Sequence, residues 1–328
     1  MSKIETIKSY TGHDLENIFF RPMLTGPSAE ELGIKVMYNM PVPTTLHFWK
    51  RSGDVLHKFD KAGWVGSAAA NKYQKTLDLK RVKAEVGYSA EDYFSMVYEL
   101  ITASPNVNME DLSGTELEAA ETELFRRAIA ESIRMNLWLG DKGGTLSTGY
   151  TSFDGLLKIV NERSAQSKFQ YAATNLSTQI DNYEISEVLA KLIDNASPRL
   201  KGLFNDGQVA FFVSPKIFSL YQSHLDSTFG SAAYQDYQNG RKQLMFRGFP
   251  IIEVNLNPAI GDSDLSEDFI IFTDRRNLVM AVNTADSPGS EIRMWYNPDE
   301  MENRQRAVFT IGCDILDDEL VCTMIDAE

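Results

Sequence analysis

The chain has 328 residues, of which 43% are hydrophobic and 24% charged, as is ordinary for a globular protein of two or three compact units. Its net charge of −14 argues against a nucleic-acid-binding protein, because binding the phosphate backbone requires clustered Lys and Arg. No apolar run approaches the ~18 residues of a membrane span, and the first residues lack an apolar signal segment. We therefore expect a cytoplasmic protein without membrane contact.

The N-terminal quarter of the chain predicts an arm followed by a hairpin. The first 40 residues have no sustained hydrophobic period, which indicates an extended arm with a short helical turn near 29–32. In the segment 41–75, apolar residues flank the turn-forming sequence Ser52-Gly53-Asp54, as expected for a β-hairpin. The segment 74–88 alternates between apolar and polar residues but slips by one position between Leu79 and Val82. This slip predicts a long strand with a bulge or bend.

Basic residues gather in this hairpin region. Between Met40 and Glu85 there are nine basic and four acidic residues, so this segment carries +5 and the rest of the chain −19. A basic arm on an acidic body favours self-association, because complementary charges steer and orient the encounter. The alternative is a solvated basic hairpin without a partner.

Aromatic residues accompany these basic residues, and Trp, Tyr and Arg are enriched at the energetic centres of protein interfaces. Stacking on single-stranded nucleic acid would use the same residue types, but the acidic remainder of the chain argues against it. We therefore predict an interface between subunits. Its candidate residues, together with two aromatic residues of the arm, are Trp49, Lys50, Arg51, Lys58, Lys61, Trp64, Lys72, Lys75, Phe19 and Phe20.

Two helices are expected after the hairpin. Ser89-x-x-Asp92 provides an N-cap that is followed by apolar residues at helical spacing. Ser113-x-x-Glu116 is a capping box that begins a long amphipathic helix over 114–139, and Gly140 provides its C-terminal stop. At ~1.5 Å per residue this helix would span ~39 Å, a length suited to supporting a sheet.

The middle of the chain alternates helix and strand, whereas its last fifth consists of strands. The expected α/β unit has a helix at 185–195, a strand at 209–213, a helix that Ser214-Pro215 begins and a strand at 250–254. Five strands then follow, at 269–273, 278–283, 291–296, 307–312 and 319–325. This order predicts a discontinuous domain that contains an inserted α/β unit.

No catalytic or metal-binding motif is recognisable in the sequence. The four histidines are scattered, and none has a partner at ligand spacing. Cys313 and Cys322 do not have a zinc spacing, and we expect reduced thiols in the core. The acidic run at 314–319 is expected to form a turn between strands. We therefore predict a protein without enzymatic activity, metal or cofactor; the alternative is an α/β enzyme with its site in the middle unit.

Four short motifs follow one another along the chain, namely Trp138-Leu139-Gly140-Asp141, Phe153-Asp154-Gly155-Leu156-Leu157, Phe246-Arg247-Gly248-Phe249-Pro250 and Phe272-Thr273-Asp274. In order and spacing they resemble the major capsid proteins of tailed bacteriophages, which have the Hong Kong 97-type fold. In that family a long spine helix ends in a Leu-x-Gly-Asp turn, and a Gly-Leu-Leu element leads into the next domain.

The resemblance implies an α+β fold of the Hong Kong 97 type with an inserted α/β axial domain. Its parts are an N-terminal arm (1–40), an extended loop formed by the hairpin (41–75), a peripheral domain with a sheet and the spine helix 114–139 (76–151 and 268–328), and the axial domain (152–267). In this family the extended loop reaches over an adjacent subunit, and axial domains meet around five- and six-fold axes.

The function that the resemblance implies is that of a major capsid protein. Its subunits self-assemble through pentamers and hexamers into the icosahedral shell of a virion, which encloses phage double-stranded DNA without sequence-specific binding. Assembly of the procapsid would take place in the bacterial host cytoplasm, with scaffolding, portal and decoration proteins as further partners. The alternative within the same fold is an encapsulin-like nanocompartment shell, which encloses a protein cargo instead of DNA.

Overall fold

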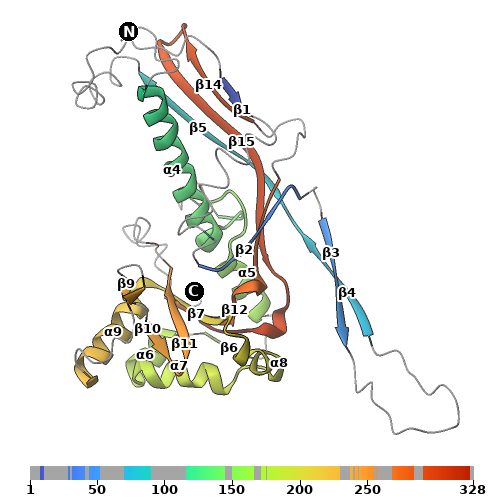
Figure 1. The fold of residues 1–328 in the computed structure, drawn as a ribbon, viewed down its shortest axis with the longest axis vertical. Helices are drawn as coiled ribbons and strands as arrows, with labels where there is room; N and C mark the ends of the chain where they lie inside the picture. Colours follow the sequence, from blue (N-terminus) through green and yellow to red (C-terminus); the bar gives the residue numbers. More distant parts are fainter. Residues whose placement is uncertain are drawn as a thin grey trace, which may run out of the picture.

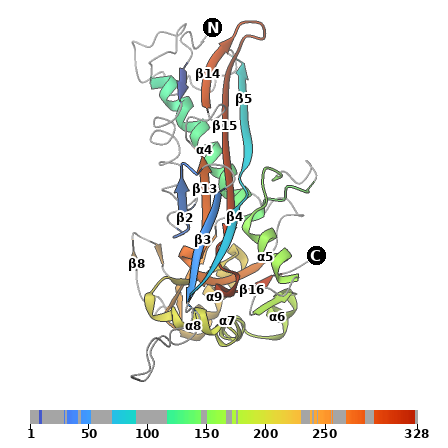
Figure 2. The ribbon, with the colours of Figure 1, turned by 90° about the vertical axis from the view of Figure 1, so that its right-hand side faces the viewer.

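A computed structural model describes most of the body of the chain and parts of its N-terminal region. The described residues are 8–10, 29, 32–40, 44–51, 70–89, 116–144, 150–165, 171–174, 176–229, 237–238, 241–242, 244–254, 256, 268–283 and 291–325. In these ranges one sheet with a long helix forms an elongated upper part, and a second sheet with several helices forms the lower part (Figures 1 and 2).

β15 (Glu302–Ile315) is the central strand of the first sheet. It pairs antiparallel with β5 (Lys80–Ser89) on one side. On its other side it pairs antiparallel with β14 (Glu291–Asn297) and then with β13 (Leu278–Asn283). Two short strands extend the sheet beyond β14 and β13, respectively, and these are β1 (Lys8–Tyr10) and β2 (Lys35–Tyr38).

The helix α4 (Glu116–Leu139) covers one face of the first sheet (Figure 1). Because alternate residues of a strand face the same way, Phe309 and Ile311 of β15 share the helix-facing side. There they are buried in one core with Phe125 and Ile129 of the helix. Up to Thr310 the other face of β15 carries half-exposed side chains, as is typical of an antiparallel sheet with one covered face, whereas the last five residues of the strand are buried.

The second sheet is mixed and has six strands in the order β10-β11-β7-β12-β16-β6. In chain order they are β6 (Tyr171–Thr174), β7 (Val209–Val213), β10 (Leu244–Phe246), β11 (Phe249–Glu253), β12 (Phe269–Asp274) and β16 (Val321–Ile325). The pairs β11–β7 and β16–β6 are parallel, and the other neighbours are antiparallel.

Both faces of the second sheet are covered. Phe212 and Ile271 belong to the core that this sheet shares with α4 and the first sheet. Their chain neighbours Phe211 and Phe272 belong to a second core on the opposite face. α5 (Leu156–Ala165) lies with α4 on the first side, and the helices of the opposite side are α6 (Leu176–Asn182), α7 (Ile185–Asp194), α8 (Pro198–Gly202) and α9 (Pro215–Phe229).

The sheet pairing differs from the expected grouping of residues 268–328 with the long helix. β12 and β16 lie in that range, yet they pair with each other in the second sheet, where β12 is next to β7. The composition of β12 explains the difference. Phe269-Ile270-Ile271-Phe272 is apolar at consecutive positions, and of the two sheets it is the second that offers apolar cover on both faces.

β3 (Thr44–Arg51) and β4 (Ala70–Leu77) form a two-stranded antiparallel ribbon that extends away from both sheets (Figure 1). The hairpin predicted in the segment 41–75 is present as this ribbon. Its strands are not joined directly at Ser52-Gly53-Asp54, because Arg51 at the end of β3 pairs with Ala70. Residues 52–69 lie outside the described residues.

The predicted bend between Leu79 and Val82 corresponds to a break at Asp78 and Leu79, where β4 ends and β5 begins. Leu77 and Leu79 are both buried in a small core with Ala281. Beyond the break, the apolar positions from Val82 onward pack against the core under α4. The shift in phase therefore marks the point where the ribbon joins the first sheet.

Most predicted elements of the described ranges are present. The long helix was expected at 114–139 and spans Glu116–Leu139, while β7 and β13 have the expected bounds. The strand expected at 307–312 is longer, Glu302–Ile315. The helices α5, α6 and α8 were not predicted. The helix expected after Ser89 and the capping residue Ser113 lie outside the described residues.

Trp138, near the end of α4, joins this helix to the second sheet. It is fully buried, and its ring centroid lies 5.6 Å from that of Phe269 and 5.8 Å from that of Phe212. We expect Trp138→Ala to lower the free energy of unfolding by about 3–5 kcal/mol, because it leaves a cavity where helix and sheet meet. Chemical denaturation measures this loss. The control is Trp295→Ala, which removes a partly exposed ring beside Arg306. Equal losses in both variants would contradict the prediction.

Candidate assembly site

Two glycines bring the end of α4 and the start of α5 into direct backbone contact. Gly155 N–H donates to Gly140 O at 2.7 Å, and Gly140 N–H donates to Asn136 O at 3.0 Å. A Cβ atom at Gly140 would lie 2.2 Å from Phe153 O, and one at Gly155 would lie 2.7 Å from Gly140 N. Because a side chain fits at neither position, the two segments approach this closely only with glycine at both.

Further hydrogen bonds hold the connection between the two helices. Asp141 N–H donates to Tyr150 O at 2.8 Å. The Asn136 side chain donates to Ser132 O at 2.8 Å and accepts from Ser152 N–H at 3.3 Å. The two glycine-containing motifs found in the sequence on either side of this connection are therefore parts of one structural unit.

A cluster of charges lies beside this glycine junction. Lys158 Nζ of α5 is 2.5 Å from Asp141 Oδ1 and 2.7 Å from Asp154 Oδ1. Burial lowers the pKa of Lys158, but the hydrogen bonds to Asp141 and Asp154 outweigh this effect and raise the pKa to about 12. The pKa of Asp141 is lowered, chiefly by its hydrogen bond from Lys158. These ion pairs stabilise the arrangement in which α5 starts directly after the junction.

The acidic run at 314–319 forms the turn between β15 and β16, as predicted. Basic side chains from other parts of the chain compensate its charge. Arg163 of α5 binds Asp314 and lies 2.7 Å from Asp318 Oδ1. Lys75 Nζ of β4 lies 3.7 Å from a carboxylate oxygen of each of the same two residues.

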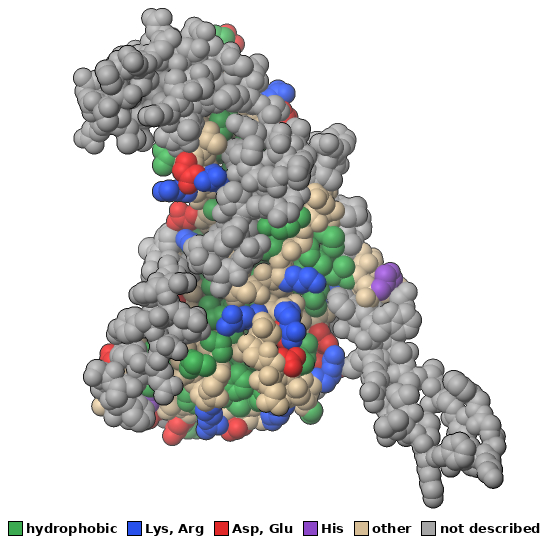
Figure 3. Space-filling model, viewed as in Figure 1, with side chains coloured by type: hydrophobic (Ala, Val, Ile, Leu, Met, Phe, Trp, Pro, Cys, Tyr) green, Lys and Arg blue, Asp and Glu red, His purple; other side chains and the backbone are tan. Residues whose placement is uncertain are grey.

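Arg199 of α8 binds the other two acidic side chains of this turn. Its Nη1 lies 2.5 Å from Asp317 Oδ2 and 2.8 Å from Glu319 Oε2. The turn therefore connects the ribbon, α5 and α8, and its carboxylates act as joints between elements. On the face of the body shown in Figure 3, Lys and Arg side chains likewise lie next to Asp and Glu side chains.

Five of the ten candidate interface residues lie in the strands of the ribbon. Within β3 and β4 the register places Trp49 opposite Lys72. Lys50 and Arg51 follow Trp49 at the end of β3 that is farther from the body (Figure 1). For these four residues the structure describes only the backbone. Lys75 is the member whose side chain is described, and it faces the acidic turn of its own chain.

The other five candidate residues are Lys58, Lys61, Trp64, Phe19 and Phe20, and they lie outside the described residues. The ribbon brings together the strand positions of Trp49 and Lys72, and Lys75 lies apart from them at the body. The involvement of all ten residues in an interface stays a prediction. The sequence analysis did not identify Arg163 and Arg199, because their acidic partners are more than 100 positions away in the chain.

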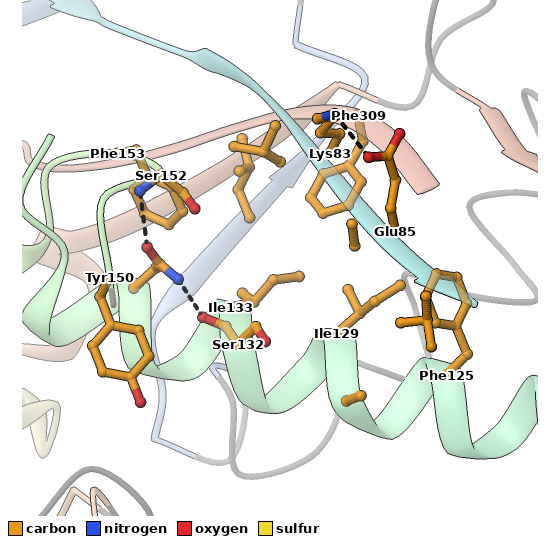
Figure 4. A pocket seen from close by; sticks show the side chains of 16 residues that line it. Lys83, Glu85, Phe125, Ile129, Ser132, Ile133, Tyr150, Ser152, Phe153 and Phe309 are labelled. Carbon is orange, nitrogen blue, oxygen red and sulfur yellow. Dashed lines mark hydrogen bonds and ion pairs between the residues drawn. The ribbon is translucent and has the colours of Figure 1, made fainter. Parts of the chain in front are cut away.

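An open cavity of about 330 Å³ lies between α4 and the edge strand β5 (Figure 4). Hydrophobic side chains that line it include Phe125 and Ile129 of the helix and Phe309 of β15. Lys83 and Glu85 of β5, which form an ion pair at 2.8 Å, also line it. The cavity is therefore an opening in the core between helix and sheet, with a charged pair on one side.

No arrangement typical of a metal site was found among the described residues. They contain no group of three or more His, Cys, Asp or Glu side chains that could hold a metal ion. His47 is exposed on β3, and His224 Nδ1 lies 3.9 Å from Glu184 Oε2. His13 and His57 lie outside the described ranges.

The two cysteines are buried, as predicted. Cys313 Sγ lies 3.3 Å from Asp154 O, and Cys322 Sγ lies 3.3 Å from Leu192 O. Burial raises the pKa of both thiols, to about 12 for Cys322, so both stay protonated. Among the helices of the described ranges, none is long and apolar enough to cross a membrane.

Comparisons with known proteins identify the fold. No protein-family model matches the sequence, and no curated protein matches it significantly. Among solved structures, a chain of the satellite phage P4 procapsid including the size determination (Sid) protein matches with a TM-score of 0.59 at 11% identity, over 93% of this chain and 97% of that chain.

Two further matches are with shell structures. The capsid of Myoviridae phage XM1 gives a TM-score of 0.49 at 14% identity, over 92% of each chain. The holo-SrpI encapsulin complex from Synechococcus elongatus gives 0.44 at 12% identity, over 88% of this chain and 84% of that chain. The match to the P4 procapsid chain extends over nearly all of both chains, so the fold of this chain is that of phage capsid proteins.

The glycine junction predicts a large effect of a single methyl group. We expect Gly140→Ala to lower the free energy of unfolding by about 2 kcal/mol or more, because its Cβ would overlap backbone atoms that cannot move independently. Gly202→Ala is the matched control, since a Cβ there has nothing within 4 Å and alanine favours the helix α8. Urea denaturation of both variants measures the difference. A loss in Gly140→Ala no larger than in the control would contradict the close approach.

The charge cluster predicts a pH-dependent contribution of Lys158. We expect Lys158→Met to lower the free energy of unfolding by about 1 kcal/mol near neutral pH, since the ion pairs are partly exposed. Because the pKa of Asp141 is lowered in the folded protein, its carboxylate stabilises the fold above about pH 4. This contribution is lost as the pH falls through the pKa that Asp141 has in the folded protein. The raised pKa of Lys158 means that its contribution persists to about pH 10 and is lost as the pH rises toward 12.

Denaturation of the native protein and Lys158→Met across this pH range tests the prediction. The difference between the two proteins should be constant near neutral pH and should shrink on the acid side. Lys35→Met, at an exposed position of β2, is the control and should show no such difference. A difference that is independent of pH would show that Lys158 acts through packing.

Proposed function

We propose that this chain is the major capsid protein of a tailed bacteriophage and that its role is structural. The observation that carries the proposal is the match to the P4 procapsid chain, with a TM-score of 0.59 over 93% of this chain and 97% of that chain. A match over nearly the whole of both chains supports a common architecture. For an enzymatic role, no observation on the described residues gives support of this kind.

In this proposal each part of the fold has a place in the shell. The first sheet and α4 form the peripheral domain, and α4 is its spine helix. The second sheet and α5–α9 form the axial domain, to which β12 and β16 also contribute. The ribbon of β3 and β4 is the base of the extended loop. Sheet pairing and core membership support this division.

The ribbon supports self-association on physical grounds. A two-stranded ribbon is marginally stable in water, because it gains little apolar burial against the entropy of ordering its residues. Beyond its base, this ribbon extends away from both cores of its own chain (Figure 1). A neighbouring subunit would provide the missing cover. In the proposal, the extended loop therefore lies across an adjacent copy.

The charge distribution supports the same contact. The segment between Met40 and Glu85 carries +5 on a chain of net charge −14, so a basic loop would meet a predominantly acidic neighbour. The interface candidates remain Trp49, Lys50, Arg51, Lys58, Lys61, Trp64, Lys72 and Lys75, with Phe19 and Phe20 of the arm. The acidic body also fits a shell that encloses double-stranded DNA without binding its sequence.

In the proposed assembly, subunits form pentamers and hexamers that close into an icosahedral shell, with the same surfaces reused at each axis. The shell would be built as a procapsid in the cytoplasm of a bacterial host and become the capsid of the virion. Scaffolding, portal and decoration proteins are the further partners that we propose for this role. An encapsulin-like compartment differs in its content, which would be a protein cargo.

Expression of the chain alone, and with its neighbouring phage assembly genes, tests the proposal. We expect pentamers, hexamers or closed shells, because the ribbon and the charge asymmetry both favour contact between copies. Size-exclusion chromatography with light scattering measures the mass, and electron microscopy shows the particles. Enclosed DNA would support a capsid, and enclosed protein would support the compartment. A monomer under both conditions would contradict the proposal.

A charge-neutralised ribbon is the appropriate variant. Combining Lys50→Gln, Arg51→Gln and Lys72→Gln should raise the protein concentration needed for assembly by about 10- to 100-fold, since each intersubunit ion pair contributes a few tenths to 1 kcal/mol. The matched control replaces three basic residues that lie exposed on the body, Lys35→Gln, Lys83→Gln and Arg127→Gln. An equal effect in both triple variants would show that net charge, and not the ribbon, controls assembly.

A further inference from the structure

The ribbon leaves the body beside a compact group of four charges. Lys75 Nζ lies 3.7 Å from Asp314 Oδ1 and 3.7 Å from Asp318 Oδ1. Arg163 binds Asp314 and lies 2.7 Å from Asp318 Oδ1. Two cations thus share two carboxylates. They come from three separate places in the fold: the ribbon, the helix α5 and the turn after β15.

Lys75 occupies the position at which the ribbon separates from the core. Two residues further along β4, Leu77 is buried with Leu79 and Ala281 in the small core at the base of the ribbon. Because alternate residues of a strand face the same way, Lys75 is the next position outward on this face. Its side chain is only 20% exposed, and that of Asp314 only 10%. The ammonium group is therefore enclosed between the ribbon and the acidic turn.

This arrangement does not favour the charged form of Lys75. Burial lowers the pKa of Lys75, and together with repulsion by Arg163 it outweighs the attraction of Asp314 and Asp318. A cation held under such conditions adds little to stability, and an apolar side chain of similar size often stabilises a fold as well or better. The two carboxylates instead restrict the position of the Lys75 side chain, because its ammonium group must stay close to both of them.

We propose that Lys75 is a positioning residue that sets the angle at which the ribbon leaves the body. Leu77 and Leu79 anchor the base of the ribbon, and the contact of Lys75 with the acidic turn prevents rotation about that anchor. In the shell this angle determines where the ribbon meets the adjacent subunit. That last step depends on the proposed function, whereas the angle itself is a property of the single chain.

Distances within the dilute, unassembled chain test this inference. The native cysteines are both buried, so spin labels can be attached selectively to cysteines introduced at exposed positions. His47→Cys on β3 and Glu187→Cys on α7 place one label on the ribbon and one on the body. Double electron–electron resonance then gives the distribution of distances between the two labels.

We expect a narrow distribution with Lys75 in place, and a broader distribution with a shifted mean for Lys75→Met. Lys75→Arg should restore the narrow distribution, because it retains a cation between the two carboxylates. Lys83→Met, at an exposed lysine of β5, is the matched control and should leave the distances unchanged. The melting temperature of Lys75→Met should stay within about 3 °C of that of the native protein, because the charge adds little to stability.

An unchanged distance distribution in Lys75→Met would overturn the inference. If the melting temperature falls strongly at the same time, Lys75 stabilises the fold without orienting the ribbon. Because the distances are measured before assembly, a chain that shows the expected changes but never forms shells would contradict the proposed function and leave this inference intact.

Discussion

The close backbone contact between Gly140 and Gly155 is the constraint on which the arrangement of the two sheets depends. It ends α4 and places the start of α5 within one hydrogen bond of that end. The two helices together cover one face of the second sheet, where Trp138 is buried against Phe212 and Phe269. Because a packed interior does not deform continuously, a wider junction would displace helix and sheet together. A contact of a few atoms thus determines how the upper and lower parts of the molecule meet.

Charged groups are concentrated at the places where separate elements meet. Lys158 holds the connection after α4, and Arg163, Arg199 and Lys75 converge on the turn after β15. Isolated surface pairs add little stability, but partly buried pairs that share carboxylates restrict relative orientation. In an acidic chain, the basic residues that contact the body of their own chain therefore serve mainly as joints.

Elements with a strong local pattern could be predicted from the sequence, whereas the partners of those elements could not. The apolar runs of β7 and β13 and the amphipathic pattern of α4 depend on neighbouring residues, so their bounds were predicted closely. The assignment of β12 and β16 to the second sheet depends on which sheet has two covered faces, and this is a property of the whole fold.

The same limit applies to the candidate site. Residue types and charge in the segment 41–75 predicted a basic hairpin, and the family resemblance implied that it extends outward. The structure contains a projecting ribbon there. The sequence could not show that Lys75 faces the acidic turn of its own chain, because the two lie more than 200 residues apart. It also could not distinguish Arg163 and Arg199 from the other basic residues, since only their positions in the fold bring them to that turn.

The second sheet is buried on both faces whereas the ribbon is not, and this contrast favours assembly with other subunits. The second sheet is covered on both faces by buried side chains, while the ribbon adds exposed residues and a partly buried cation. Neither feature improves the stability of a single chain. In the proposed function, a contact with a neighbouring subunit offsets that cost. In the closed shell that we propose, an adjacent copy is the partner that is present at the same surface in every position.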